Sequence, residues 1–400
     1  MPIHSLASLK EDVTTSQIVV GASTFLLLFG VKLWAPPTPT ILSLMHHLLH
    51  LPSPPQILFL PPVASPLPES LLTLLHTIRL SAARNPMAQL HCEPLPKNPP
   101  AIKEFTKQWS TVPYGTAGEG GRRIDAIVLG EGWEVDASPK AKFNVDDKTA
   151  TTTWDVNQFH FHFITSLLPS LLKVPPERNI RIVSLVSPTW SSAVPSLHGK
   201  PLKARSIIQA SGANALRTLL LMTHFQLILD TLASSIYSVK KPVPDPEEGK
   251  PLRKKRDEKI QSNIMGISVI MGWTRDEIAR RLVISWGWGM LWMILYPLVL
   301  ILTPSPARSI QSILFALQAP VRYGPIDDLP SVVQGKEKVD ERRSAVRGGE
   351  VVRDCAVVDV PPVLSSPMLA RETYETIEKE VETGVKESNA REKMGSTKKD

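Results

Sequence analysis

RIVSLVSPTW, residues 181–190, is the stretch that decides the fold of this chain. Its first half is an apolar run that predicts a buried strand. Two further runs of this kind lie on either side of it, IDAIVLGEG at 124–132 and ISVIMGWT at 267–274. Between the first and the second strand lies VNQFHFHFITSLLPSLL at 156–172, which predicts a long helix. Strands that alternate with helices predict parallel strands joined by right-handed crossovers.

The same alternation extends along most of the chain. The predicted strands are Gln56–Leu60, Gln89–Leu95, Ile124–Leu129, Asn179–Ser187, Ile264–Ile270 and Val351–Val360. The predicted helices are Ile41–Leu51, Glu69–Ala83, Ile102–Trp109, Thr153–Leu172, Ala204–Tyr237 and a charged surface helix at Met368–Lys386. We therefore expect an α/β fold with a doubly wound parallel sheet, of the Rossmann-like type.

The segments between 124 and 274 together resemble the central part of a short-chain dehydrogenase/reductase of the ketoreductase-like kind. The resemblance places Asn157 at the helix asparagine that supports the proton relay of that family, and Ser187 at its catalytic serine. It also places Gly132 in the turn after the strand 124–129, and Gly272 and Thr274 beside the nicotinamide. The resemblance implies NAD(P) as the cofactor if the chain is active.

The residues at the two central catalytic positions do not fit that chemistry. The segment RSIIQASGANALRTLLLMTHF at 205–225 resembles the helix in which the family keeps a tyrosine and, four residues later, a lysine. These positions hold Ile208 and Gly212. In the family the tyrosine donates a proton to the carbonyl and the lysine lowers its pKa. Neither isoleucine nor glycine can donate a proton or carry a charge.

The loop after the first predicted strand also departs from a dinucleotide-binding pattern. Such a loop needs glycines, because side chains there collide with the pyrophosphate. Residues 61–70 read PPVASPLPES, with no glycine and four prolines. Proline also lacks the N–H group that would bind phosphate.

Composition leaves a large core possible and gives no metal or nucleic-acid signal. The chain has 400 residues, 42% of them apolar, a net charge of +7 and 37 prolines. Its two cysteines provide neither a disulfide framework nor metal-ligand spacing. His160 and His162 are two residues apart on a helix and point in different directions, so we interpret them as packing residues. His46, His47 and His50 could bring two imidazoles to one face, but no acidic partner lies nearby.

Two long apolar runs predict contact with a membrane. IVVGASTFLLLFGVKLW at 18–34 is long enough to reach the short limit for a spanning helix, and we expect an uncleaved N-terminal transmembrane anchor. A buried or interfacial helix and a signal peptide are the alternatives. VISWGWGMLWMILYPLVLILT at 283–303 carries no charge. Because predicted strands lie on both sides of it, we expect a membrane-facing segment, with a second span as the alternative.

These expectations give a domain plan and two functional hypotheses. The plan is an anchor at 1–35, a Pro-rich connector at 36–55, the dehydrogenase-like domain at 56–360 with a mobile insertion at 240–262, and a charged helix and tail at 361–400.

The first hypothesis is a protein of an intracellular membrane, such as the endoplasmic reticulum, that has lost ordinary catalysis. It would bind a membrane lipid, a lipophilic small molecule or a protein partner, but no nucleic acid. The second is a divergent NAD(P)-dependent oxidoreductase for a lipophilic carbonyl or alcohol, in which Ser187 and Asn157 would take part.

Overall fold

The computed structural model describes residues 40–111, 124–130, 154–175, 177–198, 207–239, 261–272, 306–322 and 345–396. The chain divides into two units, Met1–Pro39 and Thr40–Asp400, and every described residue belongs to the second. The apolar runs 18–34 and 283–303 lie outside the described residues, as does nearly all of the insertion 240–262. Among the helices that the structure describes, none has the length and apolar character needed to span a membrane.

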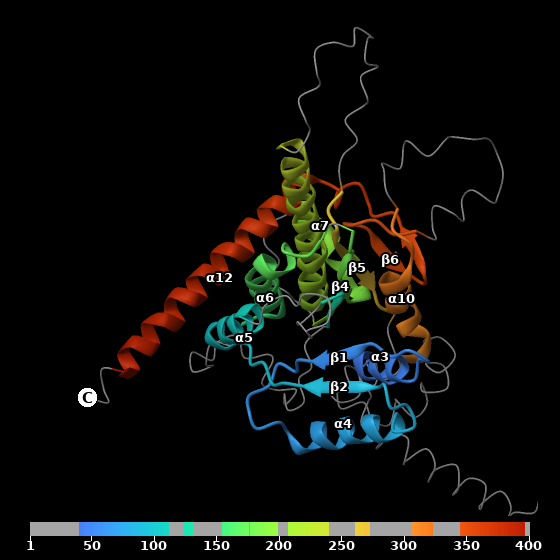
Figure 1. Cartoon of the computed structure of the whole chain (residues 1–400). Coiled ribbons are helices and arrows are strands. Elements are labelled where there is room, and N and C mark those ends of the chain that lie inside the picture. Colours follow the sequence, from blue (N-terminus) through green and yellow to red (C-terminus); the bar gives the residue numbers. More distant parts are fainter. Residues whose placement is uncertain are drawn as a thin grey trace, which may run out of the picture. The chain divides into compact units, whose positions relative to one another are not determined.

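The larger sheet is formed by the strands that the sequence analysis placed at its centre (Figure 1). Its order is β3 (Ala126–Leu129), β4 (Ile180–Val186), β5 (Ile264–Ile270), β6 (Val351–Arg353) and β7 (Ala356–Val358). The first four strands are parallel, and only β7 is antiparallel. Every residue of β5 is buried, as expected for a parallel strand that is covered on both faces.

Helices cover both faces of this sheet. Alternate residues of each strand point to opposite faces and so pack against different helices. One face carries Ile180 and Ile182, which share a core with α5 (Pro99–Thr111), α6 (Val156–Leu171) and α7 (Ile207–Val239). The other face carries Val183 and Leu185, which share a core with α10 (Pro306–Gln318) and with Leu44 of α3 (Thr40–Leu49). The expected α/β class with a parallel sheet is therefore confirmed.

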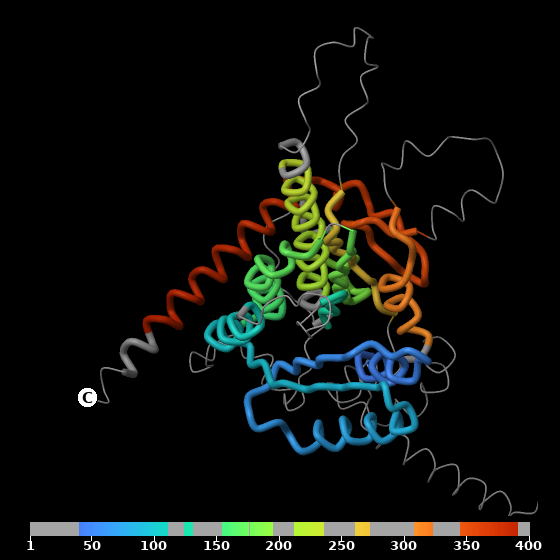
Figure 2. The backbone as a smooth tube through the Cα atoms, in the orientation of Figure 1, coloured from blue at the N-terminus to red at the C-terminus, as the bar shows by residue number. Residues whose placement is uncertain are grey.

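The first two strands do not join this sheet, which corrects the expectation of one continuous doubly wound sheet. β1 (Gln56–Phe59) and β2 (Gln89–Cys92) form a separate parallel pair, and no pairing among the described residues connects them to β3. The chain runs from β1 through α4 (Glu69–Ser81) back to β2 (Figure 2). This pair has its own core, in which α3 and α4 supply most of the buried side chains.

Four further elements differ from the prediction. The predicted strand 351–360 is the hairpin β6–β7, because Asp354 and Cys355 take positive φ values of 50° and 59° and turn the chain. The predicted surface helix 368–386 is the 30-residue α12 (Pro367–Ser396), which packs on α5, α6 and α7. The 3-10 helix η2 (Pro188–His198) and α10 were not predicted.

Candidate functional site

The carboxyl ends of β3, β4 and β5 meet at one edge of the sheet, where α/β proteins usually bind their ligands. Ser187 follows β4 directly, and Gly272 follows β5 after one residue. Gly130 follows β3. The candidate cofactor residues Gly132 and Thr274 lie outside the described residues. The described part of the site therefore centres on β4, η2 and the start of α7.

Ser187 is a buried serine whose hydroxyl oxygen already has a partner. The Oγ1 hydroxyl of Thr189 donates to Ser187 Oγ across 3.0 Å. Ser192 Oγ in turn donates to the backbone carbonyl of Thr189, at 2.7 Å. The first bond links η2 to the end of β4, and the second lies within the first turns of η2. The sequence SPTW places a threonine two residues after the serine, which allows this hydrogen bond. The sequence analysis did not predict it.

Gly212 lies where the resemblance places the lysine, and the structure leaves no room for a side chain there. A Cβ atom at Gly212 would lie 2.5 Å from the carbonyl oxygen of Thr189 and would also overlap Ser192 Oγ. A carbonyl oxygen is part of the backbone and cannot rotate away. A lysine at position 212 would therefore push η2 away from α7. Ile208, at the tyrosine position, lies in the first turn of α7.

Asn157 is buried and links α6 to α7. Its Nδ2 donates to the carbonyl of Asn214 at 3.3 Å, and its Oδ1 accepts from Thr218 Oγ1 at 2.6 Å. Both oxygen and nitrogen of the amide are therefore used between two helices, as a buried amide requires. Asn157 and Ser187 are connected through α7 and η2. Asn157 bonds Asn214, which lies two residues after Gly212 in α7. Gly212 packs on Thr189 of η2, and Thr189 bonds Ser187.

The start of α6 depends on a capping box rather than on the predicted residue Thr153. Asp155 is the N-cap, and its side chain accepts from Val156 N at 2.8 Å. Gln158 returns the contact by accepting from Asp155 N at 3.1 Å. This reciprocal pair satisfies two N–H groups that a helix start leaves without a partner inside the helix. It fixes the first turn of α6, from which Asn157 and His160 extend.

A side chain from α3 occupies the space beside the end of β3. Ile41 lies so close to Gly130 that a Cβ atom at Gly130 would overlap Ile41 Cδ1. Ile41 also packs with both the core on the α10 face and the core around α3 and α4. The crevice outside the carboxyl end of a parallel strand is where a dinucleotide would be expected. Here the Ile41 side chain lies against the backbone of Gly130, directly after β3.

His160 is a buried imidazole near the same edge. Burial, and to a smaller extent the charge of Lys97, lower the pKa of His160 to about 4, although a hydrogen bond to the Gly130 backbone opposes the shift. Its Nδ1 atom has no hydrogen-bond partner among the described residues. Burial also lowers the pKa of Lys97, while Asp155 raises it. His160 is therefore a neutral packing residue at neutral pH, and Lys97 is a neighbour that the sequence analysis missed.

The loop after β1 folds back on itself instead of forming a phosphate-binding turn. Val63 N donates to the carbonyl of Pro61 at 2.8 Å, and Leu95 N donates to the same carbonyl at 2.9 Å. Val63 and Leu67 pack against the core formed by α3 and α4. The carbonyl of Pro61 and the N–H of Val63 are thus bonded within the protein.

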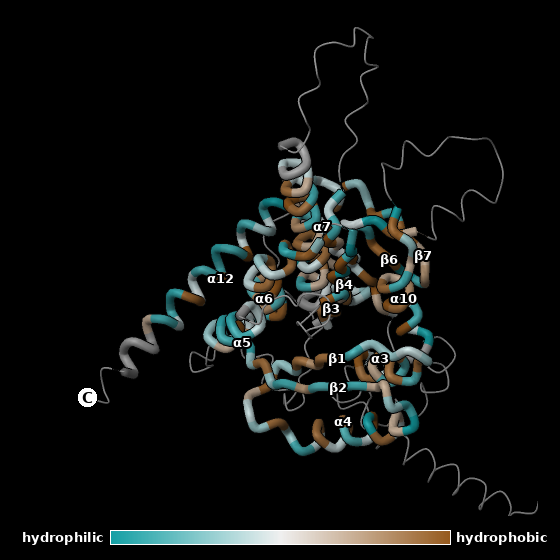
Figure 3. The backbone as a smooth tube through the Cα atoms, in the orientation of Figure 1, coloured by the Kyte–Doolittle hydropathy of each residue, from teal (hydrophilic) through white to brown (hydrophobic). Residues whose placement is uncertain are grey.

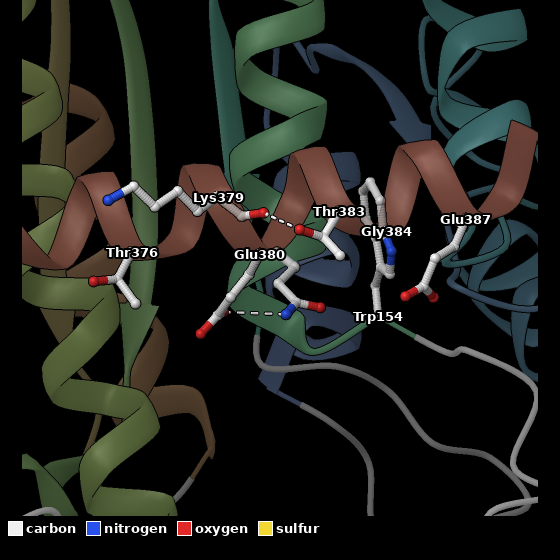
Figure 4. A pocket seen from close by; sticks show the side chains of 8 residues that line it. Trp154, Thr376, Lys379, Glu380, Thr383, Gly384 and Glu387 are labelled. Atoms are coloured by element: carbon white, nitrogen blue, oxygen red, sulfur yellow. Dashed lines mark hydrogen bonds between the residues drawn. The ribbon is translucent and has the colours of Figure 1, made fainter.

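An open groove of about 500 Å³ lies between the start of α6 and α12 (Figure 4). Trp154 forms one wall, and Gly384 of α12 packs against its indole so closely that a Cβ would lie 2.6 Å from Nε1. Glu380 at the groove binds Arg217 of α7 at 2.7 and 2.9 Å and accepts from Gln158 of α6 at 3.1 Å. These contacts hold α12 on α6 and α7.

No cluster of histidine, cysteine, aspartate or glutamate among the described residues could hold a metal ion. The rings of His46 and His50 do lie close together, with their centroids 4.2 Å apart and their planes tilted by 32°. Both nitrogens of His50 face backbone carbonyl groups, which take the place that a metal ion would need. His162 packs edge-on against Trp154.

Among known proteins, the likeness of this chain is to solved structures and is distant. No family model matches the chain, and no curated protein matches it. Among solved structures, the chain is similar to the enoyl-[acyl-carrier-protein] reductase (NADH) of Aquifex aeolicus VF5, with a TM-score of 0.38 and 14% sequence identity. That match covers 79% of this chain and 88% of the other.

Proposed function

We propose that this chain is a membrane-associated protein that keeps a short-chain-dehydrogenase-like scaffold without its ordinary catalysis, and that it binds a lipid or a protein partner. The observation that carries the proposal is the contact of Gly212 with Thr189. A family lysine at this position would need room that the backbone of η2 occupies. Without that lysine and its tyrosine, hydride transfer lacks a proton donor with a suitable pKa.

The other candidate residues support the same proposal. Ser187 accepts a hydrogen bond from Thr189, and both polar atoms of the Asn157 amide form hydrogen bonds with α7. Ile41 lies close to Gly130 at the carboxyl end of β3. Pro61 binds its own loop through its carbonyl. Each of these residues has a packing or linking role that stabilises the fold and does not depend on catalysis.

The catalytic part is tested by cofactor titration of the purified full chain. We expect no quenching or enhancement of NADH or NADPH fluorescence at cofactor concentrations up to about 1 mM, and no turnover of long-chain or sterol ketones. Tight binding of either nucleotide together with turnover would overturn this part. In that case Ser187→Ala and Asn157→Ala would decide whether these two residues take part, since loss of kcat without loss of folding would assign them a role.

The membrane part is tested separately by fractionation. The full chain should stay with membranes after an alkaline wash, because the apolar run 18–34 favours insertion. A variant with Leu26→Arg and Leu28→Arg should appear in the wash, since charges at the centre of a span are costly. A full chain that washes off as readily as this variant would contradict membrane anchoring by 18–34.

A further inference from the structure

The first part of α12 covers an apolar surface beside η2. α12 is mostly hydrophilic, with isolated apolar positions along it (Figure 3). Ala370 is fully buried in one cluster with Leu216 and Leu220 of α7 and with Ala193 of η2. None of the roles described above uses this contact. We define residues 367–378, which make it, as the α12 strap.

Tyr374 joins the α12 strap to two helices at once. Its ring centroid lies 5.0 Å from that of Phe161 on α6 and 4.9 Å from that of His224 on α7. The Nδ1 atom of His224 is buried and has no hydrogen-bond partner among the described residues. A neutral imidazole can leave one ring nitrogen without a proton, whereas an imidazolium carries a proton on both. Protonation of His224 in the docked strap therefore creates a charged, buried N–H without an acceptor in this part of the structure.

Two charged residues of the strap act on His224. Arg371 Nε donates to Glu375 Oε1 at 2.7 Å, so this carboxylate already has a partner. Burial most strongly, and then the charge of Arg371, lower the pKa of His224, while the charge of Glu375 opposes them. A group whose pKa is lower in the docked state stabilises docking less and less as the pH falls below the pKa of the free imidazole. Acidification therefore weakens the hold of the strap on α7.

The other titratable groups around this contact have partners or positions of their own. Burial and the charge of Glu378 raise the pKa of Tyr374, so its phenol stays neutral in acid. On α7 itself, Arg217 pairs with Glu380, and Asp230 accepts hydrogen bonds. The other elements that pack on α7 are α6 with His160 and His162, β4 with Arg181, η2 with His198, and β5 without a titratable residue. The charges that act on His224 thus come from the strap.

We propose that the α12 strap is a pH-sensitive cover, which lies on the apolar surface of α7 and η2 while His224 is neutral and opens more often when His224 gains a proton. The contact of His224 with Tyr374 is where the proton acts, because it joins the strap to α7. The ion pair of Glu380 with Arg217 holds the next turn of α12, so opening is confined to the strap. This inference depends neither on membrane association nor on the loss of catalysis.

The test measures amide hydrogen exchange of the purified full chain at about pH 7.5 and about pH 5.5, with rates corrected for the intrinsic pH dependence of exchange. Peptides covering 367–378 report on the strap, and peptides covering 180–186 report on the core strand β4. The strap should be less protected than β4 at both pH values. One imidazole with a free pKa of about 6.5 can change an opening equilibrium by at most about tenfold over this range. We expect acidification to raise the opening of 367–378 by roughly threefold to tenfold.

Two variants remove the titrating group. His224→Phe keeps a ring that can pack on Tyr374, and His224→Gln keeps a polar side chain without a charge. In both variants, most of the acid-dependent rise in the opening of 367–378 should disappear, because neither side chain gains a proton. His76→Phe is the matched control, since His76 is exposed on α4 and its replacement should leave the rise unchanged.

A rise of the same size in the folded His224 variants would overturn the inference. Fast exchange of 367–378 at both pH values in both variants would leave His224 a packing role alone and would overturn it as well. So would equal protection of 367–378 and 180–186, because the strap would then open only together with the core. None of these outcomes depends on membrane or nucleotide binding, so they are distinct from the tests of the proposed function.

Discussion

Gly212 lies in a helix at a position where the neighbouring backbone decides which residue fits. Glycine inside a helix normally costs about 0.5–1 kcal/mol relative to alanine, so Gly→Ala should stabilise. Here the added Cβ would lie 2.5 Å from the Thr189 carbonyl oxygen. We therefore expect Gly212→Ala to lower the free energy of unfolding by about 1–3 kcal/mol, as overpacking does.

Urea unfolding followed by circular dichroism measures this effect. Asn214→Ala provides the control, because Asn214 is exposed two residues further along the same helix and should change stability by less than about 0.5 kcal/mol. A Gly212→Ala protein that is more stable than the unaltered chain would show that η2 does not pack on α7 at this contact.

His160 makes a pH dependence measurable. Burial and the charge of Lys97 lower the pKa of His160 to about 4, whereas an unfolded histidine has a pKa of about 6.5. Between these values the unfolded chain binds a proton that the folded chain does not, so stability falls as the pH falls. Between pH 7 and pH 5 we expect His160 to account for a loss of about 2 kcal/mol.

Unfolding free energies at both pH values, for the unaltered chain and for His160→Gln, isolate this contribution. Burial also lowers the pKa of His162 and of His224, so both proteins should lose stability on acidification. The loss should be smaller by about 2 kcal/mol in His160→Gln. Equal losses in the two proteins would mean that His160 is accessible to protons in the folded state.

At the scale of elements, α12 differs most from its prediction. Its sequence is rich in charged residues, which predicted a solvated helix. The structure buries Ala370, Ile377 and Val381 along one side of it, and Tyr374 packs edge-on against Phe161 of α6. One apolar residue in each turn lets a helix bury one side when a complementary face is available. That face belongs to α6 and α7, far away in the sequence.

At the scale of the whole molecule, the separate sheets predict two regions of different stability. Leu71 of α4 and Ile182 of β4 are both fully buried, but they belong to different cores. Leu71→Ala should remove about 2–5 kcal/mol of packing from the core around α3 and α4. We expect it to accelerate amide exchange in β1, α4 and β2 much more than in β4 and β5.

Native-state hydrogen exchange measures both regions in one experiment. Ile182→Ala is the matched variant, since it removes a comparable apolar volume from the larger sheet. It should accelerate exchange in β4 and β5 at least as strongly as in β1 and β2. If Leu71→Ala accelerated exchange equally in both regions, the two cores would unfold as one cooperative unit.

The sequence alone determined the α/β class, the parallel strands and most element positions. Local apolar periodicity carries this information, because a strand buried on both faces must be apolar throughout, as Ile264–Ile270 is. The departures at Ile208, Gly212 and residues 61–70 were visible in the sequence as well. Ser187 and Asn157 were found through the resemblance, and their roles in the chemistry remain predictions.

Only the tertiary structure decided what surrounds these residues. The contact of Gly212 with Thr189, the link from Asn157 to Thr218 and the closeness of Ile41 to Gly130 all join residues from different elements. The pairing of β1 with β2, apart from the larger sheet among the described strands, is of the same kind. Such contacts depend on how separate elements pack, and no local pattern of residue types encodes them.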